Sequence, residues 1–551
     1  MARRKQPPPP QPPHTTWIER FQAVGLVLLI LLAWSNSFST SLHFDDFHAL
    51  SDRYVAAPGL GLEIFRFGQT RPLTYFSFHL NYLAGGMDPY GYHVVNLLLH
   101  LANSLLMLAI ARRHLAPLAA GLAAALFALH PIQTESVTYI FARSTLLATL
   151  FALLCFWFYL RDRPVVSALF FALSLLAKEE TVALPAFLVL YDYARQHRPR
   201  WGYYASLLAI AALAAARLFY LLETVPDAQA GFHLRGVPAH LYALTQFRVI
   251  WIYLRLLLLP MGLNLDHDVG LSQGLLSPWT TLPAMLGILG LVAGHGWMLW
   301  TKRSRPALWM LGFLSLLAPS SSIVAQADLI FEHRTYYPLT CLVIVAAAAL
   351  SAALQKLPLA GRWIVSAILL ASLCAGVWTR NRVWQDEKTL WTDVLAKSPN
   401  KARGYLGLGR AIAAEDPQRA RELMEKGLQI DPNFADLQTN LGVVLIRLDD
   451  PRAALGHFQK AMSLTHPTPE HMNNIGAAQY RMGNAAAAET SYRTALRLDP
   501  CAGNARLNLM HVLDVQGNRP EASRTGEVPS GCRLPVDLAR QIADYRKNLG
   551  P

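Results

Sequence analysis

Long apolar runs separated by short polar turns fill about the first two thirds of the chain. Most of these runs approach the roughly 20 residues that an α-helix needs to cross a bilayer. The pattern therefore predicts an all-α, polytopic membrane protein. The twelve runs span residues 21–34, 91–110, 115–129, 144–160, 165–177, 182–193, 203–222, 241–259, 281–300, 307–324, 336–354 and 363–377.

Basic residues gather in the turns and predict the sidedness, because lysine and arginine accumulate in cytoplasmic loops. With the amino end inside, all five basic turns are cytoplasmic if the run 241–259 does not cross. That run carries Arg248 and Arg255 and ends at Pro260, so we expect it to lie in the outer interface or to re-enter. Eleven crossings are predicted. The turns contain Arg112 and Arg113; Arg161 and Arg163; Arg195, Arg198 and Arg200; Lys302, Arg303 and Arg305; Lys356 and Arg362.

Composition supports the membrane class, with 53% hydrophobic and only 15% charged residues. The net charge of +13 does not indicate a nucleic-acid partner, because many of the basic residues lie in the turns. Residues 1–16 include a basic, proline-rich stretch and are expected to form a disordered cytoplasmic tail. No small-residue cleavage site follows the first run, which predicts an uncleaved helix.

A second pattern begins near Ser398, where a 34-residue period replaces the leucine runs. This period, with small residues at helix contacts and a closing proline, is typical of tetratricopeptide repeats. We expect three repeats and a degenerate fourth, forming a solenoid whose concave surface binds peptides or proteins. The recurring positions are Ala420, Ala454 and Ala488; Gly427, Ala461 and Ala495; and Gly409, Gly442 and Gly476, followed by Met510 in the fourth unit.

The chain thus divides into five predicted parts: a tail 1–16, a membrane domain 17–380, a linker helix 381–397, a repeat solenoid 398–520 and an extension 521–551. The predicted topology places the solenoid outside the cytoplasm. In that compartment Cys501 and Cys532 can form a disulfide.

Polar residues that could carry chemistry lie in loops on the predicted outer face. Adjacent acids repel each other, so Asp45 and Asp46 are either solvated or held for a task. Carboxylates beside several cations suit a reaction in which a hydroxyl loses its proton and an anionic phosphate departs. The candidates are Asp45, Asp46, Arg71, His130, Glu135, Arg143, Lys178, Glu179, His333 and Arg334.

Several candidates also have a simpler interpretation. Arg71 could reach lipid headgroups, Lys178 and Glu179 could form a salt bridge at a tight turn, and His130 could cap a helix. The stretch 266–268, Asp-His-Asp, resembles a metal cluster but has no identifiable further ligand. We therefore predict no metal site and assign no certain cofactor; a divalent cation is left open and is not indicated.

These motifs resemble the transmembrane and tetratricopeptide-repeat protein O-mannosyltransferases and their bacterial relatives, which have the type-C glycosyltransferase (GT-C) fold. Gln133 and Thr145 depart from the pattern and leave the identity of the sugar open. The resemblance rests on Phe44-Asp45-Asp46, Arg71-Pro72-Leu73-Thr74, the stretch 91–96 with His100, His130-Pro131 with Thr134-Glu135, Arg143, Lys178-Glu179, Glu332-His333-Arg334 with Tyr336 and Pro338, and the repeats that follow.

The resemblance implies an enzyme of a bacterial inner (plasma) membrane that moves a sugar, typically mannose, from a polyprenyl-phosphate donor to an extracytoplasmic protein hydroxyl. It implies that Asp45 or Asp46 deprotonates the acceptor serine or threonine, which attacks with inversion, and that Arg71, Lys178, His333 and Arg334 hold the lipid phosphate. The repeats would recruit the acceptor protein.

Two other functions fit the same residues. A degenerate transferase fold could anchor a scaffold for envelope assembly, although no hydrophobic pattern requires Asp45 and Asp46. A polymerase or ligase of surface polysaccharide would use the same donor with a glycan acceptor. Repeats of this kind usually bind peptides, which argues against the second alternative.

Overall fold

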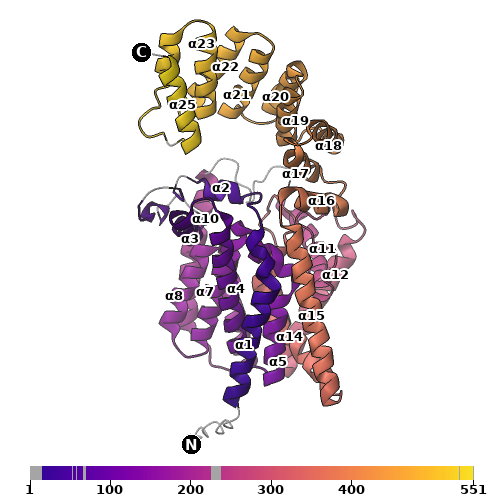
Figure 1. Ribbon diagram of the computed structural model, residues 1–551. Coiled ribbons are helices and arrows are strands. Elements are labelled where there is room, and N and C mark those ends of the chain that lie inside the picture. Colours follow the sequence, from indigo (N-terminus) through magenta and orange to yellow (C-terminus); the bar gives the residue numbers. More distant parts are fainter. Residues whose placement is uncertain are drawn as a thin grey trace, which may run out of the picture. The chain divides into compact units, whose positions relative to one another are not determined.

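The computed structural model describes residues 15–52, 54–56, 59–65, 70–224, 237–532 and 534–549. Within these ranges the regular structure is helical and contains no β-strand, which confirms the all-α class. Residues 1–14 of the predicted disordered tail lie outside the described part. The chain forms two compact units, residues 1–386 and 387–551, coloured indigo to salmon and brown to yellow in Figure 1.

Every predicted apolar run of the first unit contains a helix. By length and composition, eight helices of the described chain could cross a membrane, or nine if a bent pair is one span. The helices are α1 (Thr15–Trp34), α2 (Asp46–Leu50), α3 (Pro72–Gly85), α4 (Pro89–Ala111), α5 (Pro117–Leu129), α6 (Thr134–Thr138), α7 (Arg143–Tyr159), α8 (Pro164–Ala177), α9 (Leu184–Arg195), α10 (Trp201–Thr224), α11 (Ala239–Leu258), α12 (Thr281–Lys302), α13 (Arg305–Leu317), α14 (Tyr336–Leu354) and α15 (Leu359–Val383).

Hydrogen bonds connect four of the basic turns at one end of this helical unit. They run from turn to turn, so these turns share one end, as the positive-inside pattern requires. The bonds join Arg112 to Gln22 near the start of α1, Arg113 to the carbonyl of Leu160, Arg200 to Asp162, and Arg303 to the carbonyl of Tyr193.

Helix α11 differs from its neighbours in its contacts. A crossing helix of this length would carry its two ends to opposite faces of the bilayer, about 30 Å apart. Polar contacts of α11, from its first turn to its last, instead reach loops on the side of the candidate residues. This favours the interpretation that α11 does not cross, and the count of eleven crossings stays a prediction. The contacts join Tyr242 to the carbonyl of Ser320, Gln246 to that of Leu329, Tyr253 to that of Phe331, and His130 to that of Leu257.

The second unit is a series of antiparallel helix pairs with the predicted repeat. Ala420, Ala454 and Ala488 are fully buried between helices. A Cβ atom at Gly442 would lie 2.4 Å from the Phe458 ring, so only glycine allows this close approach. The helices are α16 (Glu387–Lys397), α17 (Ala402–Ile412), α18 (Pro417–Ile430), α19 (Ala435–Arg447), α20 (Pro451–Leu464), α21 (Pro469–Arg481), α22 (Ala485–Leu498), α23 (Gly503–Val515), α24 (Arg519–Thr525) and α25 (Val536–Leu549).

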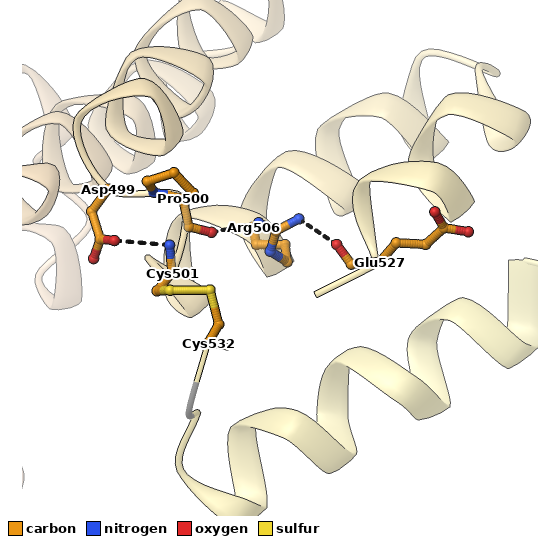
Figure 2. Close-up of a disulfide and its surroundings, with 6 residues drawn as sticks. All are labelled: Asp499, Pro500, Cys501, Arg506, Glu527 and Cys532. Atoms are coloured by element: carbon orange, nitrogen blue, oxygen red, sulfur yellow. Dashed lines mark hydrogen bonds between the residues drawn. A yellow bond between two sulfur atoms is a disulfide. The ribbon is translucent and has the colours of Figure 1, made fainter. Parts of the chain in front are cut away.

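A disulfide closes the end of the solenoid. Cys501, just before α23, is bonded to Cys532 in the turn that precedes α25, with 5.3 Å between the Cα atoms (Figure 2). Arg506 spans the same region, because its guanidinium donates to the carbonyls of Pro500 and Glu527. The bond predicted for an extracytoplasmic tail is therefore present in the fold.

Candidate functional site

The two aspartates lie at the start of α2, after a left-handed Phe44 with φ of +50°. Asp46 is buried, and its two oxygens accept the backbone N–H groups of His43 at 2.9 Å and Phe141 at 2.7 Å. Burial raises the pKa of this carboxyl to about 7, against the two backbone donors, which lower it. Asp46 thus ties the first loop to the turn before α7.

Asp45 is only partly buried, and it is held by Tyr139. The phenolic hydroxyl donates to Asp45 Oδ2 at 3.0 Å and accepts the backbone N–H of Asp45 at 3.2 Å. The carboxylate is therefore oriented by a neighbour and retains contact with solvent. Of the two acids, Asp45 is the one that a substrate can reach.

The residues that follow α15 also hold the loop that carries the aspartate pair. His43 bonds the carbonyl of Trp384 at 2.6 Å, and the backbone N–H of Ser41 donates to the carbonyl of Gln385 at 3.2 Å. The Trp384 ring lies against Tyr139, with centroids 5.8 Å apart. The aspartate pair is consequently fixed between the α15 end and the residue 139–141 turn.

A second group, the cation cluster, contains Arg71, Lys178, Glu179, Glu180 and His333. Arg71 donates from Nε and Nη2 to the two oxygens of Glu179, at 3.1 and 2.7 Å. Lys178 is buried and contacts Glu180 at 2.9 Å, so the predicted Lys178–Glu179 bridge is replaced by two other pairs. Lys178, Glu180 and Arg71 lie near enough to His333 for their charges to act on its ring.

Charges within the cation cluster shift its pKa values in opposite directions. Burial acts to raise the pKa of Glu179, but Arg71 and Lys178 together outweigh it and lower that pKa below its usual range. Burial lowers the pKa of Lys178, although Glu180 opposes the shift. The ion pair of Arg71 with Glu179 therefore stays charged over the physiological pH range.

His333 of the cation cluster is paired with the buried Glu135. Glu135 accepts His333 Nδ1 at 2.5 Å and the backbone N–H of Glu332 at 2.9 Å. Arg334 is buried, donates to the carbonyl of Asp328 at 2.8 Å, and lies 5.4 Å from the Phe331 ring centroid. The loop before α14 is thereby joined to the loop after α5.

Two predicted site residues have mainly internal partners. His130 accepts the N–H of Ile132 and bonds the carbonyl of Leu257, which is the helix-capping arrangement. Arg143 is fully buried and donates to Asn96 at 2.7 Å and Asn81 at 2.6 Å. Both residues hold elements in place around the aspartate pair and the cation cluster.

Tyr75, which was not among the predicted site residues, is close to both groups. Its hydroxyl is within range of the charges of both Arg71 and Asp45. Tyr139 was missed as well, because its contact is with Asp45, 94 positions away, and a tyrosine beside an apolar helix carries no signal in one sequence.

Within the described residues, no group of three or more His, Cys, Asp or Glu side chains is arranged to hold a metal ion. His267 of the Asp-His-Asp stretch instead contacts Glu332 at 2.8 Å. Glu332 also accepts the backbone N–H of Asn264 at 2.6 Å, so the stretch is bound to the loop before α14.

The fold defines a multi-pass membrane protein that carries tetratricopeptide repeats. The tetratricopeptide repeat family matches residues 411–470 and 472–500. The crystal structure of MamA is similar to 29% of the chain, covering 87% of MamA at 20% identity with a TM-score of 0.23.

Among curated proteins, the chain is similar to protein O-mannosyl-transferases, as the resemblance predicted. The human protein O-mannosyl-transferase TMTC3 is 23% identical over 607 residues, covering 95% of this chain and 65% of the relative. The Caenorhabditis elegans protein O-mannosyl-transferase F38B6.6 is 24% identical over 379 residues, covering 66% of this chain and 54% of the relative. The chain thus spans between about half and two thirds of the length of these relatives.

Proposed function

We propose that the protein is an integral membrane glycosyltransferase that moves a sugar from a polyprenyl-phosphate donor to serine or threonine hydroxyls of an extracytoplasmic protein. The sugar proposed is mannose, from the similarity to protein O-mannosyl-transferases. The observation that carries the proposal is the half-buried Asp45, oriented by Tyr139, together with Arg71, since both residues are near enough to Tyr75 for their charges to act on its hydroxyl. This supports assigning Asp45 as the base and Arg71 to the phosphate site.

In the proposed reaction Asp45 accepts the proton of the acceptor hydroxyl as its oxygen attacks the anomeric carbon. The new bond forms on the face opposite the departing oxygen, the bond from carbon to phosphate oxygen breaks, and its electron pair leaves with the lipid phosphate. Asp46 orients Asp45, because its own oxygens are occupied by backbone donors.

The cation cluster is proposed to hold the lipid phosphate. Arg71 uses Nε and Nη2 for Glu179, and among the described residues its Nη1 has no hydrogen-bond partner. That nitrogen can donate to a phosphate oxygen, with Lys178, His333 and Arg334 supplying further donors or charge. Glu179 keeps the guanidinium plane in a fixed orientation.

We propose an extracytoplasmic compartment for the aspartate pair and the solenoid, which the predicted topology and the disulfide support. Basic turns at one end favour a cytoplasmic face there. Disulfides persist in oxidising compartments, so the Cys501–Cys532 bond supports an extracytoplasmic solenoid. We propose that the solenoid recruits the acceptor protein, since such repeats bind peptides.

The direct test uses the full-length protein in detergent with radiolabelled polyprenyl-phosphate-mannose and a cell-envelope extract. We expect a labelled protein band with the parent and none with Asp45→Asn combined with Asp46→Asn. Asp268→Asn, an exposed acid elsewhere in the unit, is the matched control and should keep its label. Label in glycan alone would identify a polysaccharide enzyme. Absence of label with any lipid-linked donor, while the repeats still captured partners, would identify a scaffold.

Sidedness is tested separately by single cysteines in a background without reactive native thiols. Asp45→Cys, Lys178→Cys and His333→Cys should react with a membrane-impermeant reagent from the same side, and Arg198→Cys from the other. Labelling of position 178 or 333 from the side opposite to position 45 would contradict a shared pocket.

A further inference from the structure

A basic pocket lies at the end of the first unit where the basic turns meet. It has a volume of about 520 Å³ and lies against the turn between α7 and α8. This volume falls in the range of small-ligand sites. The polar part of its wall comes from Arg113, Arg161, Asp162 and Arg163, and the apolar part includes Phe158 and Val166.

Within the part of the chain that the structure describes, the arginines of this pocket are not paired with carboxylates. Arg113 and Arg161 both stack on the Trp157 indole, 4.6 and 4.4 Å from its centroid, so two positive charges lie against one ring. The acid in the wall, Asp162, is bonded to Arg200 at 2.6 Å. Among the described residues, no carboxylate forms an ion pair with Arg113, Arg161 or Arg163. An anion in the pocket would relieve their repulsion.

An apolar surface continues from the pocket along α8. Val165 is 82% exposed and Leu169, one turn further on, is 57% exposed. They share a helix face, because residues four apart are neighbours on an α-helix. Large apolar side chains exposed on a membrane helix face lipid chains. The ligand that fits both regions has an anionic head and an apolar tail.

We propose that this pocket binds an acidic glycerophospholipid of the adjacent leaflet. Its phosphate lies between the guanidiniums of Arg113, Arg161 and Arg163, and an acyl chain runs along Val165 and Leu169. Planar guanidinium groups match phosphate oxygens, and basic pockets between membrane helices suit acidic headgroups. The site goes beyond the proposed transferase function and is independent of it, since it lies at the other end of the helices.

The test is a titration of the full-length protein in neutral detergent with phosphatidylglycerol, counting bound lipid by native mass spectrometry. Each lost charge should lower the affinity for the lipid roughly fivefold. Binding should therefore weaken at least tenfold in the triple variant Arg113→Gln, Arg161→Gln and Arg163→Gln. The control is Arg198→Gln with Lys356→Gln and Arg362→Gln, which removes the same charge from other basic turns. Its affinity should stay within about twofold of the parent. Equal affinities of the two triple variants would overturn the proposal.

A second variant covers the case in which lost charge disturbs membrane insertion. Arg113→Lys with Arg161→Lys and Arg163→Lys keeps the charge but removes the planar fork, so binding should still weaken severalfold. Phosphatidylcholine should bind the parent more weakly than phosphatidylglycerol. Inorganic phosphate should fail to displace the lipid, because it has no acyl chain. Displacement by phosphate, or unchanged binding by the lysine variant, would contradict a phospholipid site.

Discussion

Tyr139 holds Asp45 by two hydrogen bonds, one to the carboxylate at 3.0 Å and one from the backbone N–H at 3.2 Å. The two residues are 94 positions apart, so the contact joins separate loops. A donor to a carboxylate favours its charged form and fixes its direction. In the proposed reaction Tyr139 is therefore a positioning residue for the base.

Replacing Tyr139 by phenylalanine removes the hydroxyl and keeps the ring beside Trp384. We expect kcat for sugar transfer to fall about tenfold with little change in donor KM, and the acidic limb of the rate–pH curve to move to higher pH. Tyr90→Phe, an exposed tyrosine at the start of α4, is the control and should leave the curve unchanged. A lower rate with an unmoved acidic limb would assign Tyr139 a purely structural role.

Asp46 predicts a pH dependence of stability. Burial raises its folded-state pKa from 3.8 to about 7, so between these values the folded protein binds a proton that the unfolded chain has released. By linkage, this residue's contribution makes stability fall as pH rises from about 4 to about 7 and level off above that.

Asp46→Asn removes this titration while other groups continue to titrate. The difference in Tm, variant minus parent, should therefore become more positive as the pH rises from 5 to 7. Thermal unfolding in detergent at several pH values measures it. A difference that stays constant or falls over this range would show that Asp46 is already ionised at pH 5.

The Arg71–Glu179 pair predicts that losing the planar geometry of Arg71 and losing its charge lower kcat/KM by different amounts. Arg71→Lys keeps the positive charge but cannot bond both carboxylate oxygens and a phosphate in one plane. We expect kcat/KM for the lipid donor to fall about tenfold in Arg71→Lys and about a hundredfold in Arg71→Gln. Arg217→Lys, on nearby α10, is the control and should change kcat/KM less than about twofold. Equal losses in the two Arg71 variants would contradict this, because they would mean that the charge of Arg71 contributes nothing beyond its planar geometry.

The helices of the membrane unit could be predicted from the sequence, because a hydrophobic run of this length in a bilayer must satisfy its backbone hydrogen bonds internally, as an α-helix does. Helix α3 was not predicted, since its 14 residues are short and include Asn81 and His79. The repeats were predicted in register, because the buried Ala454 and Gly442 recur at a fixed period.

The partners within the site could not be predicted. Arg71 and Glu179 are 108 positions apart, and their bidentate pair depends on how α3 and α8 pack together. His130 has one contact that the sequence could predict and one that it could not. Its cap on Ile132 is local and was one of two interpretations, whereas its bond to Leu257 depends on the placement of α11. Spacing along the chain determines local contacts, and tertiary packing determines the others.

The close packing at Gly442 predicts that one added methyl group destabilises the solenoid. The added Cβ of Gly442→Ala would meet the Phe458 ring at 2.4 Å, so the paired helix must shift, at a cost of about 1–3 kcal/mol. Gly456→Ala is the matched control, because its Cβ would meet no atom within 4 Å. Because Gly456 is an exposed position within α20, this change should stabilise the helix by about 0.5–1 kcal/mol. Denaturant unfolding followed by a probe in the repeats measures both, and equal effects would contradict close packing at Gly442.

The Cys501–Cys532 bond predicts both a compartment and a stability effect. It closes a loop with a sequence separation of 31, and in the chain-entropy account such a loop stabilises the folded state by about 3–4 kcal/mol. Cys501→Ser combined with Cys532→Ser should therefore lower the denaturant midpoint of the repeats, and reduction of the parent should lower it by a similar amount. Cys374→Ser, a thiol outside the disulfide, controls for cysteine loss and should leave the midpoint unchanged. In protein isolated under alkylating conditions, the two thiols should be inaccessible until a reductant is added. Two freely alkylated cysteines in that sample would contradict an oxidising location for the solenoid.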